Sequence, residues 1–210
     1  MEVYGTRIKQ NNMATFTKTV QTALLAIQSV AASSVVISSA FDMSTKLGGI
    51  VYVRFGRRAA TATSFGANIR IEASHAASGD NSWYPLTVFT STIAAVEAEA
   101  VSGTVNAGTN VITVASTTNL AAGDIIFINN STIENSEWAR IKSIVTNTSV
   151  TIEDNLVNAQ TGSTIYDGAE IFSPVVIPEG VMRIRVVVDG SVFTQAHAIN
   201  VNLMTIDYIS

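Results

Sequence analysis

The side chains that could support metal chemistry are few and widely separated in this sequence of 210 residues. The two histidines are His75 and His197, neither has a second histidine at the spacing of a ligand pair, and cysteine is absent. A metal site needs several converging ligands. We therefore expect both histidines to be ordinary surface or interface residues, and we expect no metal and no other cofactor.

Nucleophilic and carboxylate catalysis find equally little support. Serine and aspartate are plentiful, but the sequence contains no Gly-x-Ser-x-Gly elbow. Glu97 and Glu99 would share one face of a strand, as a catalytic acid and base do, but a solvated edge is the simpler interpretation. The remaining carboxylates considered are scattered: Asp80, Asp124, Glu134, Glu137, Glu153 and Asp154. The sequence thus predicts no catalytic residue and a protein that is not an enzyme.

Arginines, one glutamate and two aromatic residues form the candidate interface. The arginines and the glutamate lie on the outward faces of predicted strands, where Glu72 would bridge a charged stripe if the strands are adjacent. Ordinary cross-strand pairing, worth a few tenths of a kcal/mol per pair, and a docking face for an acidic neighbour both remain open. The two aromatics follow a polar loop, where they anchor an interface, stack on a sugar or close the end of a sandwich. The candidates are Arg54, Arg70, Glu72, Trp83, Tyr84, Arg183 and Arg185.

The composition narrows the class of partner. Charged residues make up only 13% of the chain, against about 25% in an average soluble protein. Because interface cores are depleted in charge, this composition fits a β-rich protein whose surface meets other protein, although it also fits an ordinary neutral β-domain. The net charge is −4 and Arg57-Arg58 is the only adjacent basic pair, so we expect no nucleic-acid partner. The apolar stretch Val20–Val36 is too interrupted by polar residues to span a membrane.

Strict alternation of apolar and polar residues identifies the strands that must position these side chains. Met182–Val188 and Thr194–Tyr208 are two long alternating runs, and Asp189-Gly190-Ser191 between them is a turn signal. We therefore predict a C-terminal hairpin at the centre of a β-sandwich. Further strands are predicted at Val35–Ile37, Ile50–Arg57, Asn68–Ser74 and Trp83–Phe89. In Val20–Val30, Leu24, Leu25 and Ile27 would fit a helical turn, but Val20 and Thr22 favour a strand, which we predict.

The same alternation assigns faces within each strand. In Ile50–Arg57 we place Val51, Val53 and Phe55 toward the core, and we associate Tyr52, Arg54 and Arg57 with the other face. In Asn68–Ser74 the isoleucines point inward, and Arg70 and Glu72 point outward.

Residues 101–168 differ from the rest of the chain in composition and in the length of their predicted strands. This stretch is rich in threonine and asparagine, and it contains a pseudo-repeat of strand, loop, glycine turn and strand. Its halves are Val111–Phe127 and Ser149–Tyr166, with Glu137–Ile144 as an alternating strand between them. We predict a small β-barrel inserted into a jelly-roll-like β-sandwich, an all-β protein. The sandwich is formed by residues 20–100 and 169–210, and residues 1–19 are an N-terminal arm that a partner would have to order.

The insert pattern Asn110–Ile128 followed by Glu137–Ile144 resembles small β-modules of tailed-bacteriophage virion proteins. The flanking segments Val51–Arg57, Ile69–Ser74 and Trp83–Leu86 resemble phage structural proteins. This resemblance implies a structural role on the particle, as a capsid decoration protein or a head–tail or tail accessory subunit. It implies no site residue, because it consists of β-pattern and turn chemistry.

From these observations we expect a non-enzymatic virion subunit, made in the host cytoplasm and located in the particle. It would bind other virion proteins, either the major capsid protein or head–tail and tail proteins, through its low-charge faces and its arm, and it would form a homo-oligomer. The alternative is a glycan- or receptor-binding module of a tail fibre or surface protein, with Trp83, Tyr84 and Trp138 as stacking residues. Whether Met1 or Met13 is the natural start stays open.

Overall fold

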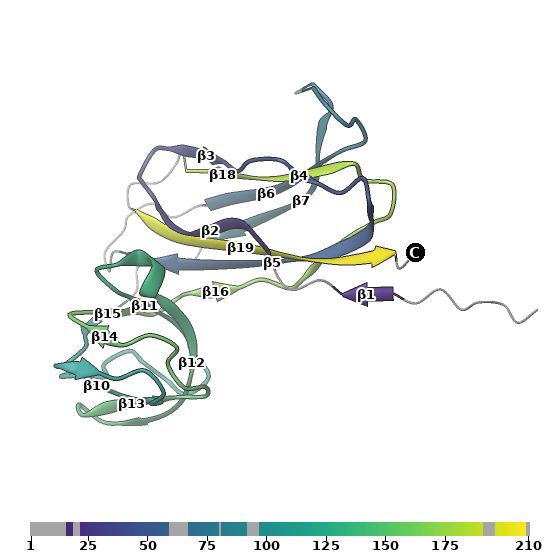
Figure 1. Cartoon of the computed structure of the whole chain (residues 1–210). Helices are drawn as coiled ribbons and strands as arrows, with labels where there is room; N and C mark the ends of the chain where they lie inside the picture. The colour runs from purple at the N-terminus through teal and green to yellow at the C-terminus, as the bar shows by residue number, and fades with distance from the viewer. Residues whose placement is uncertain are drawn as a thin grey trace, which may run out of the picture.

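The structure, a computed structural model, describes residues 16–18, 22–58, 67–79, 81–91, 97–190 and 196–208. Within these ranges every regular element is a strand except the single 3-10 turn η1, Ile133–Asn135. Two sheets pack face to face as a sandwich, and the inserted module lies beside one end of the sandwich (Figure 1). The prediction of an all-β sandwich is confirmed.

The first sheet of the sandwich has β19 (His197–Tyr208) as its central strand. On one side β19 pairs with β2 (Thr22–Val30) and, near its end, with β1 (Phe16–Lys18). On the other side it pairs along its whole length with β5 (Lys46–Arg57), the strand that ends against the insert. The far edge of β5 is covered by β16 (Glu170–Ile171) and β17 (Val175–Ile177).

The second sheet is built around β18 (Arg183–Asp189) and β6 (Ala67–Ser74). The short strands β3 (Val35–Ile37) and β4 (Phe41–Asp42) form one edge of this sheet by pairing with β18. The other edge is β7 (Trp83–Ser91), which pairs with β6.

The order of strands in the two sheets is that of a jelly roll. The eight principal strands in chain order are β2, β3, β5, β6, β7, β17, β18 and β19. The first sheet holds the first, eighth, third and sixth of these in spatial order, and the second holds the second, seventh, fourth and fifth. Except for β6 and β7, the hydrogen-bonded neighbours among these eight strands therefore come from distant parts of the sequence. The insert interrupts the connection between the fifth and sixth strands.

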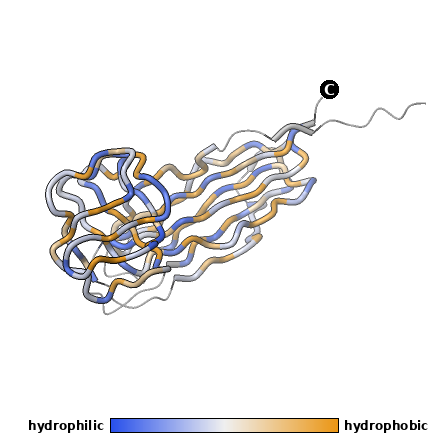
Figure 2. The backbone as a smooth tube through the Cα atoms, turned by 90° about the horizontal axis from the view of Figure 1, so that it is seen from below, coloured by the Kyte–Doolittle hydropathy of each residue, from blue (hydrophilic) through white to orange (hydrophobic). Residues whose placement is uncertain are grey.

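The core forms because one row of each alternating strand is apolar. Ile184 and Val186 of β18 face Ile199 and Val201 of β19 across the sandwich, and all four are fully buried. Figure 2 shows hydrophobic and hydrophilic positions alternating along the strands of the sandwich. Burial of one such side chain stabilises the fold by about 1.5–3 kcal/mol.

The predicted C-terminal hairpin is wrong. β18 and β19 lie in different sheets, and neither pairs with the other. Alternation fixes which face of a strand is buried but not which strand lies beside it, and two strands facing one core from opposite sides show the same pattern as hairpin partners. The turn signal instead ends β18, where the Gly190 N–H donates to the Ser34 carbonyl at 2.8 Å. The predicted start of the second strand at Thr194 lies outside the described residues.

The insert is a curled six-stranded antiparallel sheet. A bridge between Val101 and Val114, just beyond the two edge strands, brings the edges together into a partly closed barrel. A separate two-stranded sheet pairs β9 (Thr104–Val105) with β14 (Gln160–Thr161). The six strands in spatial order are β10 (Val111–Thr113), β13 (Ser149–Ile152), β12 (Glu137–Val145), β11 (Ile125–Asn129), β15 (Thr164–Tyr166) and β8 (Ala98–Ala100).

The pseudo-repeat of the sequence appears as a pairing of equivalent strands. The first strands of the two halves, β10 and β13, pair with each other, and so do the last, β11 and β15. Gly123 and Gly162 occupy the turn before the last strand in each half, with φ of 98° and 61°. A side chain at such a φ is strained, so the repeated glycine has a conformational reason.

The sandwich and the insert have separate buried clusters. The buried side chains of the larger cluster lie in residues 24–73 and 177–203, and those of the second in residues 101–165. The chain enters and leaves the insert side by side, since Ala98 pairs with Tyr166. β8, which the prediction assigned to the sandwich, pairs within the insert, while the domain division itself stays a prediction. Of the predicted arm, residues 16–18 pair with the chain's own β19, and residues 1–15 and 19 lie outside the described part.

Candidate functional site

The outer face of the second sheet collects most of the predicted interface residues. Because side chains alternate along a strand, Arg183 and Arg185 of β18 share this face with Arg70 and Glu72 of β6. Trp83 of β7 joins them, since its register partner Ser74 lies on the same face as Glu72. We call these five residues, together with Asp189, the outer-face network.

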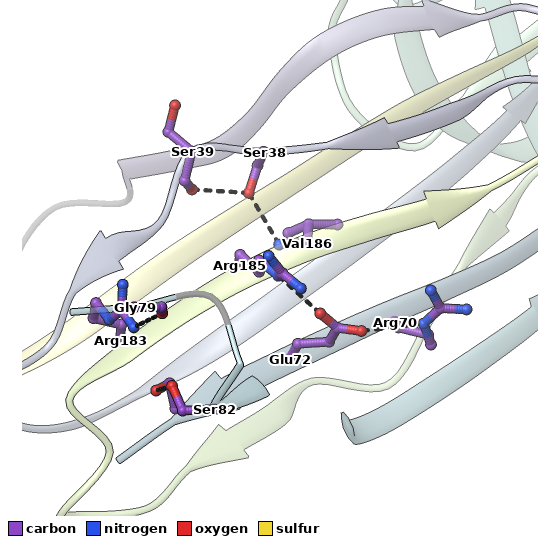
Figure 3. Close-up of polar contacts among 10 residues, drawn as sticks. Ser38, Ser39, Arg70, Glu72, Gly79, Ser82, Arg183, Arg185 and Val186 are labelled. Atoms are coloured by element: carbon purple, nitrogen blue, oxygen red, sulfur yellow. Dashed lines mark hydrogen bonds and ion pairs between the residues drawn. The ribbon is translucent and has the colours of Figure 1, made fainter. Parts of the chain in front are cut away.

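Glu72 is the centre of the outer-face network. One of its carboxylate oxygens accepts a hydrogen bond from Arg185 Nε at 2.8 Å, and the other accepts one from Arg70 Nε at 3.3 Å (Figure 3). A further oxygen, from Asp189, lies 3.6 Å from Arg70 Nη1. The Glu72 side chain is only 12% exposed, so its charge is shielded from solvent and compensated by both arginines.

Two arginines also enclose Trp83. The guanidinium carbons of Arg185 and Arg183 lie 4.3 Å and 4.8 Å from the ring centroid of Trp83, within the distance of cation–π contacts. Arg183 in turn holds the neighbouring loop, because its Nε donates to the Ala76 carbonyl at 2.8 Å and its Nη2 donates to the Gly79 carbonyl at 2.6 Å. Arg183 thus holds both the loop and the indole.

Apolar side chains flank the outer-face network on both sheet edges. Val35 and Ile37 of the edge strand β3 are each 54% exposed, and Val88 of the opposite edge is 48% exposed. Register places Ile37, Val187, Arg70 and Val88 in one row across the sheet. The face therefore combines a compensated charge network with exposed apolar residues, the composition expected of a protein–protein contact.

Two of the predicted interface residues lie elsewhere. Arg54 lies on β5 in the first sheet, where its register partner is Asn200, so it does not belong to the charged stripe. Tyr84 lies opposite Ala73 on the core side of the second sheet and packs against the main core. Period and turn signals place each residue within its own strand, but they do not say which sheet the strand joins, and adjacent residues such as Trp83 and Tyr84 must face opposite ways.

The two histidines have different surroundings. His75 is exposed; its Nδ1 donates to the Gly180 carbonyl at 3.1 Å, and its Nε2 accepts from the Tyr84 hydroxyl at 2.7 Å. His197, expected at the surface or in an interface, is instead 1% exposed, which corrects that prediction. Its ring lies against Phe55, with centroids 4.9 Å apart. Burial, and then the positive charge of Arg57, lowers the pKa of His197 to about 4.

A buried polar cluster surrounds Arg57, and it corrects the prediction that this residue lies on the face of its strand opposite Val53 and Phe55. Arg57 is fully buried and pairs in register with His197. Its Nη2 donates to the Ser91 hydroxyl at 3.3 Å, and that hydroxyl donates to the Glu170 carboxylate. Burial lowers the pKa of Arg57 to about 10, against the opposing effect of the nearby carboxylates of Glu170 and Asp167. Arg57 therefore stays charged at neutral pH, and its burial follows from alternation, since it has the same parity as Val53 and Phe55.

Three acidic residues in or beside the insert accept hydrogen bonds from other parts of the insert. The carboxylate of Glu137 accepts backbone N–H groups of Val157 and Asn158 at 2.9 and 2.7 Å, and Asp124 accepts the N–H of Ala121 at 2.7 Å. Glu97 accepts from the side chain of Asn119 at 2.8 Å rather than pairing with Glu99. Asp80 lies outside the described residues. In the described part of the chain, no three histidine, aspartate or glutamate side chains gather into a group that could hold a metal ion.

Trp138, a predicted stacking residue, lies at the junction of the two modules. Its Nε1 donates to the Phe55 carbonyl of β5 at 2.9 Å, and its ring packs beside Phe127 with centroids 4.8 Å apart. Phe127 in turn touches the backbone of Gly56, and Arg58 Nε donates to the Asn129 side chain at 2.9 Å. These contacts attach the insert to the end of β5. Among the described residues, no helix is long and apolar enough to cross a membrane.

No protein-family model matches this sequence, and no curated protein resembles it. Among solved structures, the chain is similar to a chain in the structure of the infectious bursal disease virus Gt strain, with 8% sequence identity and a TM-score of 0.23. The comparison covers 100% of this chain and 45% of the viral chain. The chain thus spans less than half the length of that neighbour, and a likeness this weak supports no conclusion about function.

Proposed function

We propose that this protein is a non-enzymatic structural subunit of a virus particle, and that it assembles through the outer face of its second sheet. The resemblance of its sequence to phage virion proteins favours a tailed bacteriophage, with the subunit located on the capsid or at the head–tail junction or tail. Its partners would then be other virion proteins and further copies of itself, with neither nucleic acid nor membrane bound.

The observation that carries this proposal is the arrangement of charge and apolar surface on the outer face. Three arginines on this face are held by Glu72 and Asp189 or over Trp83, so few of their interactions have to be reorganised on binding. Pre-ordered side chains reduce the entropy cost of association. The exposed Val35, Ile37 and Val88 supply the apolar area that a contact would remove from water.

The fold supports the proposal by analogy alone. Jelly rolls occur in viral capsid proteins and in lectins, and a fold does not determine a function. A particle presents the same contact many times, so individually weak contacts would hold a subunit by avidity. Closed symmetry would favour a ring or a trimer of this chain.

The test combines localisation with self-association. Cryo-microscopy of purified particles should show density for the subunit, with the β3 edge and the outer-face network turned toward a neighbouring protein. In solution, light scattering of the full chain should show an oligomer that the double substitution Val35→Asp, Ile37→Asp shifts to monomer. Val176→Asp is the matched control, since Val176 is 70% exposed on the other sheet. Particles that lack the protein, or a chain that stays monomeric at all concentrations, would refute the proposal.

A further inference from the structure

A cleft of about 490 Å³ lies where the insert meets the outer face of the first sheet. This volume is within the range of small-molecule sites, which often form at junctions between modules. Its sandwich wall is a row across three strands, formed by Ile171, Arg54 and Asn200, which are register partners in turn. Its other wall comes from the insert and includes Trp138, Asp154 and Asn155.

The two walls are held at a fixed separation. The hydrogen bond from Trp138 to Phe55 and the packing of Phe127 on Gly56 join the insert to the strand that carries Arg54. Trp138 is therefore both part of the junction and part of the cleft lining. A ligand would meet a preformed site and would not have to order it.

The cleft contains polar groups that the fold does not use. Arg54, Asp154 and Asn155 are exposed, and their side chains make no hydrogen bond or ion pair with the described residues. By contrast, the Glu137 carboxylate is occupied by backbone N–H groups, and Arg140 donates to the Gly123 carbonyl. Among these unused groups, Arg54 offers hydrogen-bond donors, Asp154 offers acceptors, and the Asn155 amide offers both.

The chemistry of this lining selects a class of ligand. The charged residues that line the cleft are two basic and three acidic, namely Arg54, Arg140, Glu137, Glu153 and Asp154, so the lining offers no excess of positive charge to a phosphate or a polyanion. Hydroxyl groups both donate and accept, and they match planar polar side chains such as those of Arg54, Asp154 and Asn155. The C–H faces of a sugar ring are apolar, and the indole of Trp138 and the side chain of Ile171 offer them apolar surface.

We propose that the cleft between the insert and the first sheet binds a neutral oligosaccharide. Arg54, Asp154 and Asn155 contact its hydroxyl groups, and Trp138 packs against a ring. This site is separate from the outer-face network, which lies on the opposite sheet, so it adds carbohydrate recognition to the proposed structural role.

The experiment screens the full chain on a printed array of neutral and acidic oligosaccharides, followed by calorimetric titration of the best neutral binder. We expect Arg54→Ala and Asp154→Ala each to weaken binding at least fivefold. Lys142→Ala and Glu134→Ala are matched controls: both residues are exposed on the insert outside the cleft, and their loss should change binding less than twofold. The variants remove exposed, unbonded side chains, so the fold should persist, which circular dichroism checks.

A spectroscopic readout locates the sugar. The chain has two tryptophans, so in Trp83→Phe protein the fluorescence comes from Trp138 alone. The bound oligosaccharide should shift or quench this emission with the same midpoint as calorimetry. The proposal is overturned by an array without any neutral binder, by binding that survives both cleft substitutions, or by binding that leaves the Trp138 emission unchanged.

Discussion

Trp138 of the insert donates its indole N–H to the backbone carbonyl of Phe55, 2.9 Å away on a central strand of the sandwich. One residue further along that strand, Gly56 leaves room for the ring of Phe127. The insert is thus fastened to the sandwich by a side chain reaching to backbone and by a glycine that permits close approach. The first two predictions follow from this junction.

A methyl group at Gly56 should disrupt the junction. A Cβ built there would lie 2.5 Å from Phe127 Cγ, closer than two carbon atoms can approach. We expect Gly56→Ala to lower the free energy of unfolding by roughly 1–3 kcal/mol, as overpacking does. Combining it with Phe127→Leu should recover part of the loss, and urea unfolding of the three variants measures this. Additive losses would contradict the proposed contact.

The insert should be removable. Glu97 and Asp167 flank it, and their backbone groups meet, with the Asp167 N–H donating to the Glu97 carbonyl at 3.3 Å. Replacing residues 98–166 by a short Gly-Ser linker should therefore leave a sandwich with cooperative thermal unfolding, less stable by roughly 2–4 kcal/mol because the junction contacts are lost. Residues 97–167 alone should also fold. A truncated chain without cooperative unfolding would show that the predicted domains are a single unit.

Alternation along the chain was sufficient to predict most strands and their buried faces. Alternation also predicts that Arg57 and His197 are buried, because each continues the inward-facing row of its strand. Arg57 follows Val53 and Phe55 in that row, and His197 precedes Ile199 and Val201. A charged or titratable residue at the end of a strand is ordinarily exposed, and here parity prevails over that tendency. A buried arginine is tolerated here because Ser91 and Glu170, distant in sequence, supply polar partners.

The alternation of apolar and polar residues does not predict which of the two sheets a strand joins. Arg54 and Arg70 both point outward from alternating strands, yet they lie on opposite sheets. The jelly-roll order pairs strands far apart in sequence, and pairing of this kind is set by packing of the whole core rather than by local residues. For the same reason the cleft beside Arg54, which requires the insert to lie against β5, had no local signal.

The bridge through Glu72 should be measurable as a coupling energy. A double-mutant cycle with Glu72→Gln and Arg185→Gln should give about 0.5–1 kcal/mol, because the pair is mostly shielded at 2.8 Å. The matched cycle on Arg140 and Glu153, 3.8 Å apart with side chains 47% and 53% exposed, should give close to zero. Equal couplings in the two cycles, measured by urea unfolding in low salt, would show that burial on the outer face adds nothing.

His197 should make the fold sensitive to mild acid. Burial and Arg57 lower its pKa from 6.5 to about 4. Between pH 6.5 and 4 the imidazole is therefore mostly protonated in the unfolded chain and mostly neutral in the folded chain. The free energy of unfolding should therefore fall as the pH drops from about 6.5 to 4, by roughly 3 kcal/mol at the acid end.

Burial raises the pKa of Glu170 and Asp167, and these carboxyls act in the opposite direction, so the comparison must be between variants. His197→Gln should flatten the pH dependence measured by urea unfolding. Identical slopes for wild type and His197→Gln would mean that this buried imidazole takes up its proton as readily in the folded chain as in water.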